Sequence, residues 1–219
     1  MVKQFSLDLF GTKQIDNQKH PETIILPSGE SIPDGEVIIY PNFFEELESK
    51  QLFNELISNI NWRQDKIKMF GKEVDLPRLT AWYGDEGKSY KYSGIIMNSE
   101  PWIPALLLIK ERIEKVIELN FNSVLANLYR NGKDYVSWHS DDEPELGNNP
   151  TIASVSFGVT RRFQLRHKLN KDLDTVEISL NHGSLLIMKG STQHFWKHQV
   201  PKTSKVLKER INLTFRVIN

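Results

Sequence analysis

Arg210-Ile-Asn-Leu-Thr-Phe-Arg216 is the stretch that decides the fold, because polar and apolar side chains alternate along it without interruption. In a β-strand, successive side chains point to opposite faces of the sheet. The even-numbered residues therefore share a polar face, and the odd-numbered residues share an apolar face. Two arginines on an inward-facing surface need anionic partners, since an unpaired buried charge is costly. The stretch predicts a strand whose polar face lines a site for an anion.

A candidate metal site lies upstream, in His139-Ser-Asp141 and His198. His139 and Asp141 are two residues apart, so a strand or a tight turn can present both to one ion. Two histidines and one carboxylate form the facial triad of non-haem Fe(II) oxygenases. Taken singly, each histidine is more often a solvent-exposed side chain, and an H-x-D motif is a weak signal. The three residues together with Arg210 favour the metal site.

His194 competes with His198 for the third ligand position, because the two histidines are four residues apart. On a helix this spacing makes a zinc pair, which would indicate a zinc hydrolase. Gly190, the Phe195-Trp196 pair and Pro201 argue against a stable helix here. On a strand the two histidines would lie about 13 Å apart and could not share one metal. We therefore expect His198 to be the ligand.

The two arginines of the last strand suggest a dicarboxylate as the anion. Arg210 and Arg216 are six residues apart, or about 20 Å along an extended strand, so they cannot grip one carboxylate together. Leaning toward each other, they could hold the two ends of a five-carbon diacid, each through paired hydrogen bonds. On the predicted strand 124–129, Asn127 and Tyr129 share a face and add an amide and a phenol. Exposed arginines and a polar outer strand face are the alternatives.

The bulk composition limits the class of protein. The 219 residues suffice for one substantial core, so a single domain is expected. Cysteine is absent, which excludes disulfides and thiolate metal sites. No run approaches the ~18 apolar residues of a membrane span, so no membrane partner is expected. Lys+Arg and Asp+Glu both number 28, so the overall charge does not indicate nucleic acid, although basic runs occupy residues 161–171 and 197–210.

The order of the predicted elements indicates an α+β domain. Residues 1–36 are expected to form an extended arm, and residues 37–40 a short strand. A first helix is predicted to open at Asn42, with Glu45 completing a capping box, and a second helix near residues 101–104. Helices followed by many short strands indicate a β-sandwich or a jelly-roll barrel. The strands are predicted at residues 124–129, 152–157, 162–167, 176–180, 184–188 and 210–218.

The apolar stripe of each helix predicts which of its faces is buried. The stripe of the first helix is Phe44, Leu47, Leu52, Phe53, Leu56, Ile57 and Ile60. The stripe of the second helix is Leu107, Leu108, Ile113, Val116 and Ile117.

Several of these residues resemble the motifs of a known family. Asn127-Leu-Tyr129, His139-Ser-Asp141, His198 and the stretch from Arg210 to Arg216 are similar to those of the AlkB family of Fe(II)/2-oxoglutarate-dependent dioxygenases. The resemblance covers about residues 68–218. It implies a double-stranded β-helix (jelly-roll) core with N-terminal helices packed on one side. The domain would then comprise residues 37–219, with the helices and a nucleotide-recognition region in 37–120 and the jelly-roll core in 121–219.

The resemblance also implies the cofactors and the residues that hold them. Fe(II) would be bound by His139, Asp141 and His198, with O2 as the second substrate. The cosubstrate 2-oxoglutarate would be bound by Asn127, Tyr129, Arg210, Asn212, Thr214 and Arg216, with Arg210 at its distal carboxylate.

Further motifs are similar to the branch of the family that acts on duplex DNA. Phe70, Gly71 and Lys72 resemble a hairpin that fills the gap left by an extruded base. Tyr90 and Tyr92 would stack on or border that base, although the branch has phenylalanine where Tyr92 stands. Ordinary packing and surface acid are the alternative interpretations of these substrate residues. The remaining implied contacts with the base, its strand or the phosphates are Arg78, Asp142, Glu143, Arg161, Arg162, Arg166 and Lys168.

The implied function is DNA repair by oxidative removal of N-alkyl groups from 1-methyladenine or 3-methylcytosine, releasing formaldehyde, succinate and CO2. The alkylated nitrogen is hidden in the helix, so the base must be flipped out. The expected partner is duplex DNA, with single-stranded DNA and RNA left open, and the chain is expected to be a monomer. The expected location is the cytoplasm if the source is bacterial and the nucleus if it is eukaryotic.

Other functions remain as alternatives. The runner-up is a 2-oxoglutarate-dependent demethylase or hydroxylase that acts on RNA, single strands or protein. A barrel that binds nucleic acid without catalysis would need neither the triad nor the arginine pair. The zinc hydrolase built on His194 and His198 is the most distant alternative.

Overall fold

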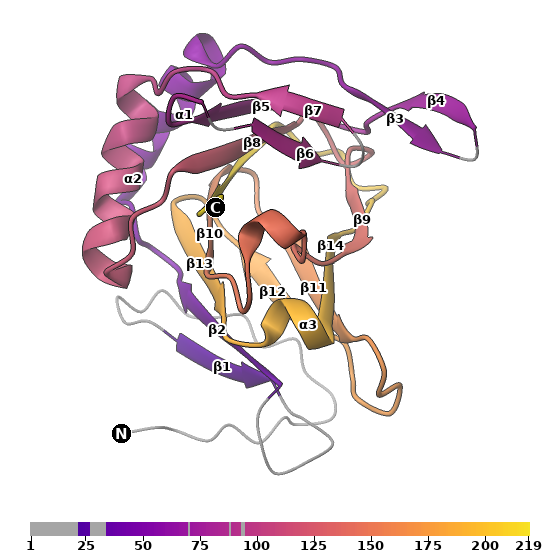
Figure 1. Cartoon of the computed structure of the whole chain (residues 1–219). Helices are drawn as coiled ribbons and strands as arrows, with labels where there is room; N and C mark the ends of the chain where they lie inside the picture. Colours follow the sequence, from indigo (N-terminus) through magenta and orange to yellow (C-terminus); the bar gives the residue numbers. More distant parts are fainter. Residues whose placement is uncertain (1–21, 27–33, 70, 88, 93–94) are drawn as a thin grey trace.

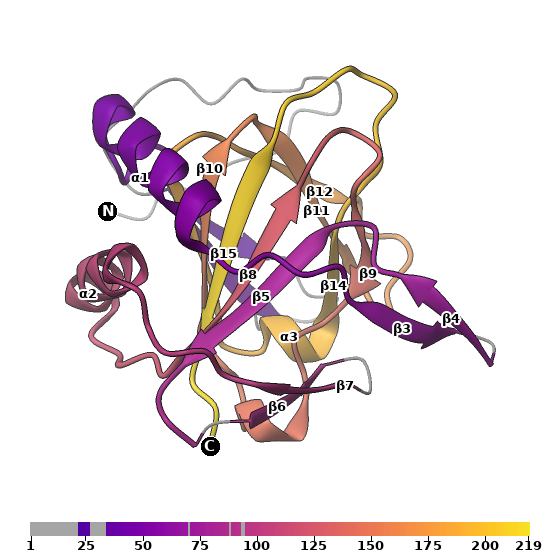
Figure 2. The ribbon, with the colours of Figure 1, turned by 90° about the horizontal axis from the view of Figure 1, so that it is seen from above.

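The computed structural model describes residues 22–26, 34–69, 71–87, 89–92 and 95–219. Within these residues two antiparallel sheets face each other, and helices cover the outer side of the larger sheet (Figures 1 and 2). This arrangement confirms the jelly-roll core with helices on one side. No helix in the described ranges is long and apolar enough to cross a membrane.

The elements have the following bounds. The larger sheet has the strand order β1 (Glu22–Leu26), β2 (Gly35–Tyr40), β13 (Ser184–Lys189), β10 (Ile152–Gly158), β15 (Arg210–Arg216), β8 (Ser123–Tyr129) and β5 (Leu79–Gly84). The smaller sheet has the order β12 (Val176–Leu180), β11 (Arg161–His167), β14 (Trp196–Val200) and β9 (Val136–His139). Two hairpins and the helices complete the fold: β3 (Lys66–Met69) with β4 (Lys72–Asp75), β6 (Ser89–Tyr92) with β7 (Ile95–Asn98), α1 (Glu46–Asn59), α2 (Pro104–Ile117), α3 (Thr192–Phe195) and the short η1 (Pro144–Leu146).

The two faces of β15 belong to two different layers, as its alternation predicted. Ile211, Leu213 and Phe215 are fully buried in the core between the larger sheet and the helices. The even-numbered residues of the strand face the smaller sheet, where a second apolar cluster surrounds the polar wall. Because β15 is flanked by β10 and β8, it is a central strand and is covered on both sides. A central strand can carry buried polar side chains only if they are satisfied by partners or ligands.

The predicted start of the first helix is wrong. The helix begins at Glu46 rather than near Asn42, and no side-chain hydrogen bond caps it. Phe44 instead donates its backbone N–H to the carbonyl of Gly183 at 3.0 Å, which keeps the preceding residues in a turn. As a consequence Leu47, assigned to the buried stripe, is 71% exposed. Leu52 and Leu56 are buried as expected.

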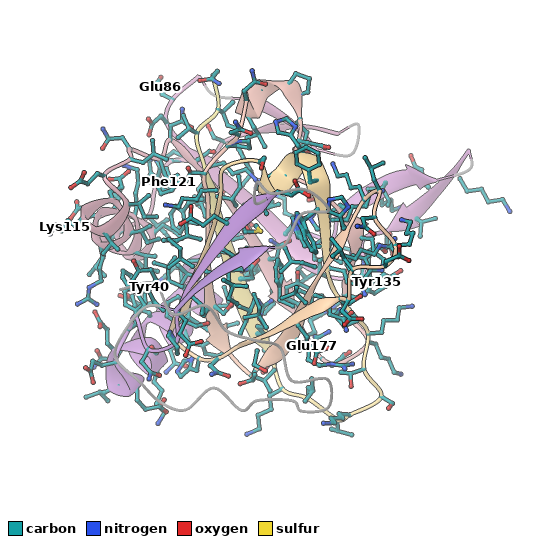
Figure 3. All side chains as sticks on the ribbon, turned by 90° about the horizontal axis from the view of Figure 1, so that it is seen from below. Tyr40, Glu86, Lys115, Phe121, Tyr135 and Glu177 are labelled. Carbon is teal, nitrogen blue, oxygen red and sulfur yellow. The ribbon has the colours of Figure 1, made fainter. Side chains whose placement is uncertain are left out.

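The second helix begins at Pro104, in agreement with its predicted start, and Ile113 of its predicted stripe is buried, but the stripe is wrong in the first turns of the helix. Leu106 and Ile109 are fully buried, whereas Leu107 and Leu108 are 38% and 48% exposed. The run of residues 105–109 is apolar throughout, so its periodicity cannot reveal which side faces the sheet. Figure 3 shows which side chains face solvent near the end of this helix: Lys115 points outward, and Phe121, which follows the helix, lies in the interior.

The N-terminal region contains more structure than the extended arm that was predicted for residues 1–36. Residues 22–26 form β1, which pairs with β2 in antiparallel register from Glu22–Ile39 to Leu26–Gly35. The pair lies at one edge of the larger sheet (Figure 1). The predicted strands of the core are all present to within two residues at either end, and β5, β9 and β14 were not anticipated. The sequences of β5 and β14 do not alternate regularly between polar and apolar residues, whereas β9 alternates but is only four residues long.

We predict that Gly183→Ala destabilises the fold by about 3 kcal/mol, because its φ is +73° and an added Cβ would lie 2.4 Å from Ser49 Oγ and 2.5 Å from the Phe44 carbonyl. Urea unfolding measures the loss. Gly190→Ala is the matched control, since its φ is +59° but nothing lies within 4 Å; it should cost only about 1 kcal/mol. Equal losses in the two variants would show that the close approach of Phe44 does not matter.

Candidate metal and cosubstrate site

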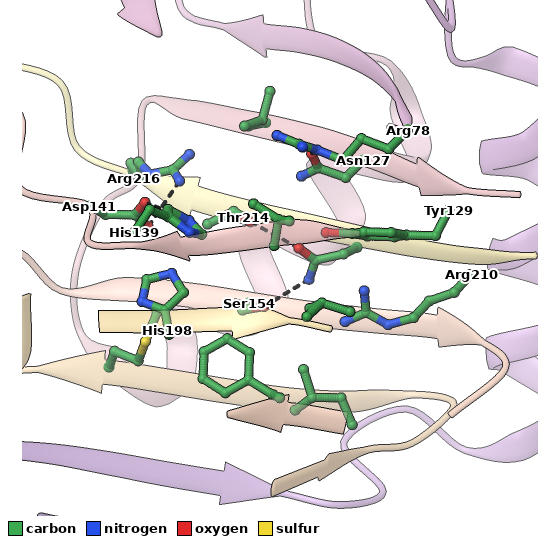
Figure 4. A pocket seen from close by; sticks show the side chains of 17 residues that line it. Arg78, Asn127, Tyr129, His139, Asp141, Ser154, His198, Arg210, Thr214 and Arg216 are labelled. Carbon is green, nitrogen blue, oxygen red and sulfur yellow. Dashed lines mark hydrogen bonds and ion pairs between the residues drawn. The ribbon is translucent and has the colours of Figure 1, made fainter. Parts of the chain in front are cut away.

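The pocket between the two sheets brings the predicted metal ligands and the polar face of β15 together (Figure 4). Its lining includes even-numbered residues of β15 and, from β8, Leu125, Asn127 and Tyr129. The register of the β8–β15 pair explains this, because Arg210 lies opposite Tyr129 and Asn212 lies opposite Asn127. The shared face predicted for each strand is therefore confirmed, and the two faces form one wall.

One end of the pocket is a cluster of His139, Asp141 and His198, whose potential ligand atoms all lie within 4.8 Å of one another. His139 is the last residue of β9, and His198 is opposite it on β14. Nδ1 of His139 donates to the Ser137 carbonyl at 2.8 Å, so Nε2 keeps its lone pair for a metal. His194 is exposed on α3 and does not belong to this cluster. The choice of His198 over His194 is confirmed.

The electrostatics of the cluster favour a bound cation. Burial lowers the pKa of His198 to about 3, with a further contribution from His139, and burial also lowers the pKa of His139. Burial alone would raise the pKa of Asp141, but Arg216 and the two histidines outweigh it and lower that pKa to about 2. At neutral pH the cluster therefore consists of two neutral imidazoles and one carboxylate. These are the protonation states in which such side chains bind metals.

Asp141 also has an unsatisfied acceptor. Its Oδ2 accepts a hydrogen bond from Arg216 at 2.9 Å. Its Oδ1 is buried and has no hydrogen-bond partner among the described residues. It lies 3.7 Å from Nε2 of His139, and both atoms are acceptors when the imidazole is neutral. Two acceptors facing each other in a buried site are destabilising unless a cation lies between them, so the donor set fits Fe(II).

The loop that carries Asp141 is held by contacts that sequence reasoning missed. Gln193 of α3 is 1% exposed and accepts the backbone N–H of Asp141 at 2.9 Å. Lys168 donates to the Asp142 carboxylate at 2.9 Å and to the Gln193 carbonyl at 2.8 Å. Ser140 donates to the Trp196 carbonyl at 2.9 Å. Nothing in the local sequence marked Gln193, because its role depends on a short helix that comes from another part of the chain.

The other end of the pocket is built around Arg210, which is 1% exposed (Figure 4). Its Nη2 donates to Ser156 Oγ at 2.9 Å, and its guanidinium lies 5.1 Å from the centre of the Tyr129 ring. Nε and Nη1 are buried without a well-formed hydrogen bond inside the described part of the chain. Burial lowers the pKa of Arg210 to about 10, so the group is still charged at neutral pH. A carboxylate is the natural partner for these free donors.

The polar residues between the two ends are hydrogen-bonded to one another. Asn212 donates to Ser154 Oγ at 2.8 Å and accepts from Thr214 at 3.1 Å. Asn127 accepts from Arg78 Nε at 2.7 Å. Ser154 and Ser156 were not predicted as site residues, although they alternate with apolar neighbours on β10, which was the signal that could have revealed them.

The prediction that the two arginines of β15 lean toward each other and hold the two ends of one diacid is wrong. Arg216 pairs with the metal-site carboxylate of Asp141, and Arg210 lies at the opposite end of the pocket (Figure 4). A ligand that satisfies Arg210 and reaches the metal cluster must therefore extend along the strand. Such a ligand needs acceptor groups at both ends, which agrees with a diacid.

The structure buries two of the predicted substrate residues, Arg78 and Arg161, and leaves Arg162 and Arg166 exposed. Arg161 is 3% exposed and donates only to backbone carbonyls, so its predicted contact with a phosphate is wrong. Arg78 is also buried, and it acts on the pocket wall through Asn127. Arg162 is exposed, beside Glu177. The basic residue Arg166 lies over the Trp138 ring at 4.2 Å.

The roles of the other predicted substrate residues stay predictions. Gly71 and Lys72 are exposed at the turn of the β3–β4 hairpin, whereas Phe70 lies outside the described residues. Tyr90 and Tyr92 belong to β6. Asp142 and Glu143 directly follow the metal-site aspartate.

Comparisons with known proteins agree with this geometry. Residues 36–216 match the family model of the 2OG-Fe(II) oxygenase superfamily. The human alpha-ketoglutarate-dependent dioxygenase alkB homolog 3 is 44% identical over 212 residues, covering 93% of this chain and 72% of that protein. The human DNA oxidative demethylase ALKBH2 is 39% identical over 188 residues, covering 82% and 72%. A solved structure of OsALKBH1 shares the fold, with a TM-score of 0.59 at 16% identity over 83% of this chain and 96% of that one.

We predict that His139→Ala weakens metal binding by about a hundredfold or more, because one of the three ligands is lost. Calorimetric titration with Mn(II) in place of Fe(II) measures the affinity. His194→Ala is the control and should bind Mn(II) as the wild type does, because His194 is exposed and outside the cluster. A similar loss in both variants would contradict the assignment of the ligands.

Proposed function

The chain belongs to the AlkB family of 2OG-Fe(II) oxygenases, and from this premise we propose that it repairs DNA by oxidative removal of N-alkyl groups from its bases. The relative ALKBH2 carries the name DNA oxidative demethylase, and this activity is the one proposed here. The observation that carries the proposal is the single pocket with an unsatisfied carboxylate oxygen at one end and unsatisfied guanidinium donors at the other. Fe(II) and 2-oxoglutarate together satisfy both ends.

Each residue of the pocket has a role in this reaction. His139, Asp141 and His198 hold Fe(II), while Arg210 and the neighbouring Tyr129 bind the distal carboxylate of 2-oxoglutarate. When bound, Fe(II), 2-oxoglutarate and O2 supply the oxidation of an N-methyl C–H bond, with release of succinate and CO2. The hydroxymethyl product then loses formaldehyde and restores the base.

Arg216 has a separate task, which is to hold the carboxylate of Asp141 in place. Its Nη2 donates to Oδ2 at 2.9 Å and leaves Oδ1 for the metal. The same contact keeps Asp141 ionised, because the positive charge lowers the pKa of the carboxylate. The ligand set therefore remains ready for Fe(II) throughout the neutral pH range.

The surroundings of the metal cluster suit an alkylated base. Adenine methylated at N1 and cytosine methylated at N3 are cations, and anionic side chains attract them. Asp142 and Glu143 directly follow the metal-site aspartate, and both acidic residues are candidates for contact with the base, although Lys168 donates to the carboxylate of Asp142. The base must leave its stack to reach the pocket. The hairpins β3–β4 and β6–β7 are the candidates for holding the opened strand (Figure 1).

A single-stranded nucleic acid, DNA or RNA, is the second candidate substrate. The chain carries 28 basic and 28 acidic residues, so it lacks the excess positive charge that strong duplex binding usually requires. Arg161 was predicted to contact a phosphate, but it is buried. The predicted duplex interface therefore has one basic contact fewer. These two observations favour a substrate bound mainly through its flipped or unpaired base.

The proposal is tested by mass spectrometry of oligonucleotides that carry one 1-methyladenine, as a single strand and as a duplex, with Fe(II), ascorbate and O2. We expect the mass to fall by one methylene unit only when 2-oxoglutarate is present. The faster of the two substrates identifies the preferred form. An unchanged mass for both, with metal-loaded and folded protein, would contradict dealkylation of DNA and direct attention to RNA or protein.

We predict that Arg210→Ala raises the KM for 2-oxoglutarate by about a hundredfold with a smaller effect on kcat, because the distal carboxylate loses its buried charged partner. Ser156→Ala is the matched variant, since it removes one hydrogen-bond partner of Arg210 but keeps the charge; we expect about a fivefold rise. Steady-state kinetics with varied 2-oxoglutarate measure both. An unchanged KM in Arg210→Ala would remove Arg210 from the cosubstrate site.

A further inference from the structure

Arg161 is a buried cation that has no role in the proposed reaction. It is the first residue of β11, pairs with Leu180 of β12, and is 3% exposed. Its side chain does not line the pocket surface itself. A buried arginine is expensive to desolvate, so its place in the fold needs an explanation.

The hydrogen bonds of Arg161 do not neutralise its charge. Nη2 donates to the carbonyls of Asp134 and Pro201, both at 2.8 Å, and Nη1 donates to the carbonyl of Asn131 at 3.2 Å. The nearby carboxylate of Asp134 is already held by Arg130, at 2.8 Å and 3.0 Å. No ion pair joins Arg161 to a carboxylate within the ranges that the structure covers. The site is therefore satisfied in hydrogen bonds but retains an excess of positive charge.

This excess charge lies beside the Arg210 end of the pocket. The guanidinium of Arg161 lies 5.6 Å from the centre of the Tyr129 ring, and that of Arg210 lies 5.1 Å from the same centre. Tyr129 itself is 2% exposed and lines the pocket. Two buried cations thus share one phenol ring, and each is attracted to its π-electrons. Burial is the largest cause of the lowered pKa of Arg210, and the positive charge of Arg161 lowers it further.

Within the described residues neither of these two neighbouring buried cations forms an ion pair with a carboxylate, so an anionic ligand would stabilise them. Arg210 meets such a ligand directly, whereas Arg161 adds a second positive charge behind Tyr129 and holds the ring in position. A ligand that lacks the distal carboxylate has no negative charge at this end of the pocket, so neither arginine strengthens its binding there. The arrangement consequently separates dicarboxylates from monocarboxylates at a distance from the metal.

We propose that Arg161 is a positioning residue that gives the cosubstrate site its preference for a 2-oxo acid with a second carboxylate, through its charge and through its contact with Tyr129. The inference rests on the proposed function, in which 2-oxoglutarate binds this pocket. It also accounts for an arginine that sequence reasoning assigned to a phosphate.

The test compares the affinities of two ligands in the Mn(II)-loaded protein by calorimetric titration. One ligand is 2-oxoglutarate, and the other is 2-oxopentanoate, which has the same 2-oxo acid group but a methyl group in place of the distal carboxylate. The ratio of the two dissociation constants measures the preference for the dicarboxylate. We expect Arg161→Gln to reduce this ratio about tenfold by weakening 2-oxoglutarate alone.

Two further variants make the outcome specific. Arg161→Lys keeps the charge and should keep the ratio within about twofold of the wild type, even if both ligands bind somewhat more weakly. Arg162→Gln removes the adjacent exposed arginine, which lies beside Glu177, and should change neither affinity. In steady-state kinetics, Arg161→Gln should raise the KM for 2-oxoglutarate while leaving kcat largely unchanged.

Several results would overturn the proposal. An equal weakening of both ligands in Arg161→Gln would mean that Arg161 only supports the fold. An unchanged ratio would mean that its charge is not felt at the ligand. If Arg161→Gln does not fold, a tenfold loss of the ratio in folded Arg161→Lys would contradict the role of the charge. A wild-type protein that binds neither ligand would instead contradict the proposed function itself.

Discussion

The structure depends on a concentration of buried charge between two sheets. Arg216 and Asp141 form an ion pair whose side chains are 3% and 2% exposed, and Arg210 lies on the same strand face with free donors. A buried ion pair is a weak source of stability, because desolvation offsets most of its Coulombic attraction. The apolar cores on either side of the larger sheet must therefore stabilise the fold, and the polar wall is retained for its ligands. The polar residues of the pocket contribute little to the stability of the fold and serve to bind ligands.

The architecture separates rigid parts of the site from adaptable ones. Metal and cosubstrate residues are on β8, β9, β14 and β15 or on a loop that Gln193 and Lys168 hold in place. Side chains on the strands of a sheet are held more precisely than side chains on loops. The candidate substrate residues instead belong to the two hairpins and to the segment after Asp141.

Sequence reasoning succeeded where the information is local. Strict alternation in β15 identified the wall of the pocket, and the two-residue spacing of His139 and Asp141 identified the metal loop. It failed where the answer depends on tertiary packing. The apolar run at the start of α2 does not reveal its buried face, and nothing near Arg161 distinguishes a surface arginine from one enclosed by three carbonyls. Gln193 was missed for the same reason, since its partner Asp141 is 52 residues away.

The central claim is that the triad and the Arg210 end form one site, occupied by a metal and a chelating diacid together. Calorimetric titration of 2-oxoglutarate into Mn(II)-loaded and metal-free protein tests this claim most directly. The account predicts one 2-oxoglutarate per chain, bound at least about tenfold more tightly when the metal is present, because one end of the ligand then coordinates the ion while the other meets Arg210. Binding that is equally strong without metal, or absent in both forms, would contradict it.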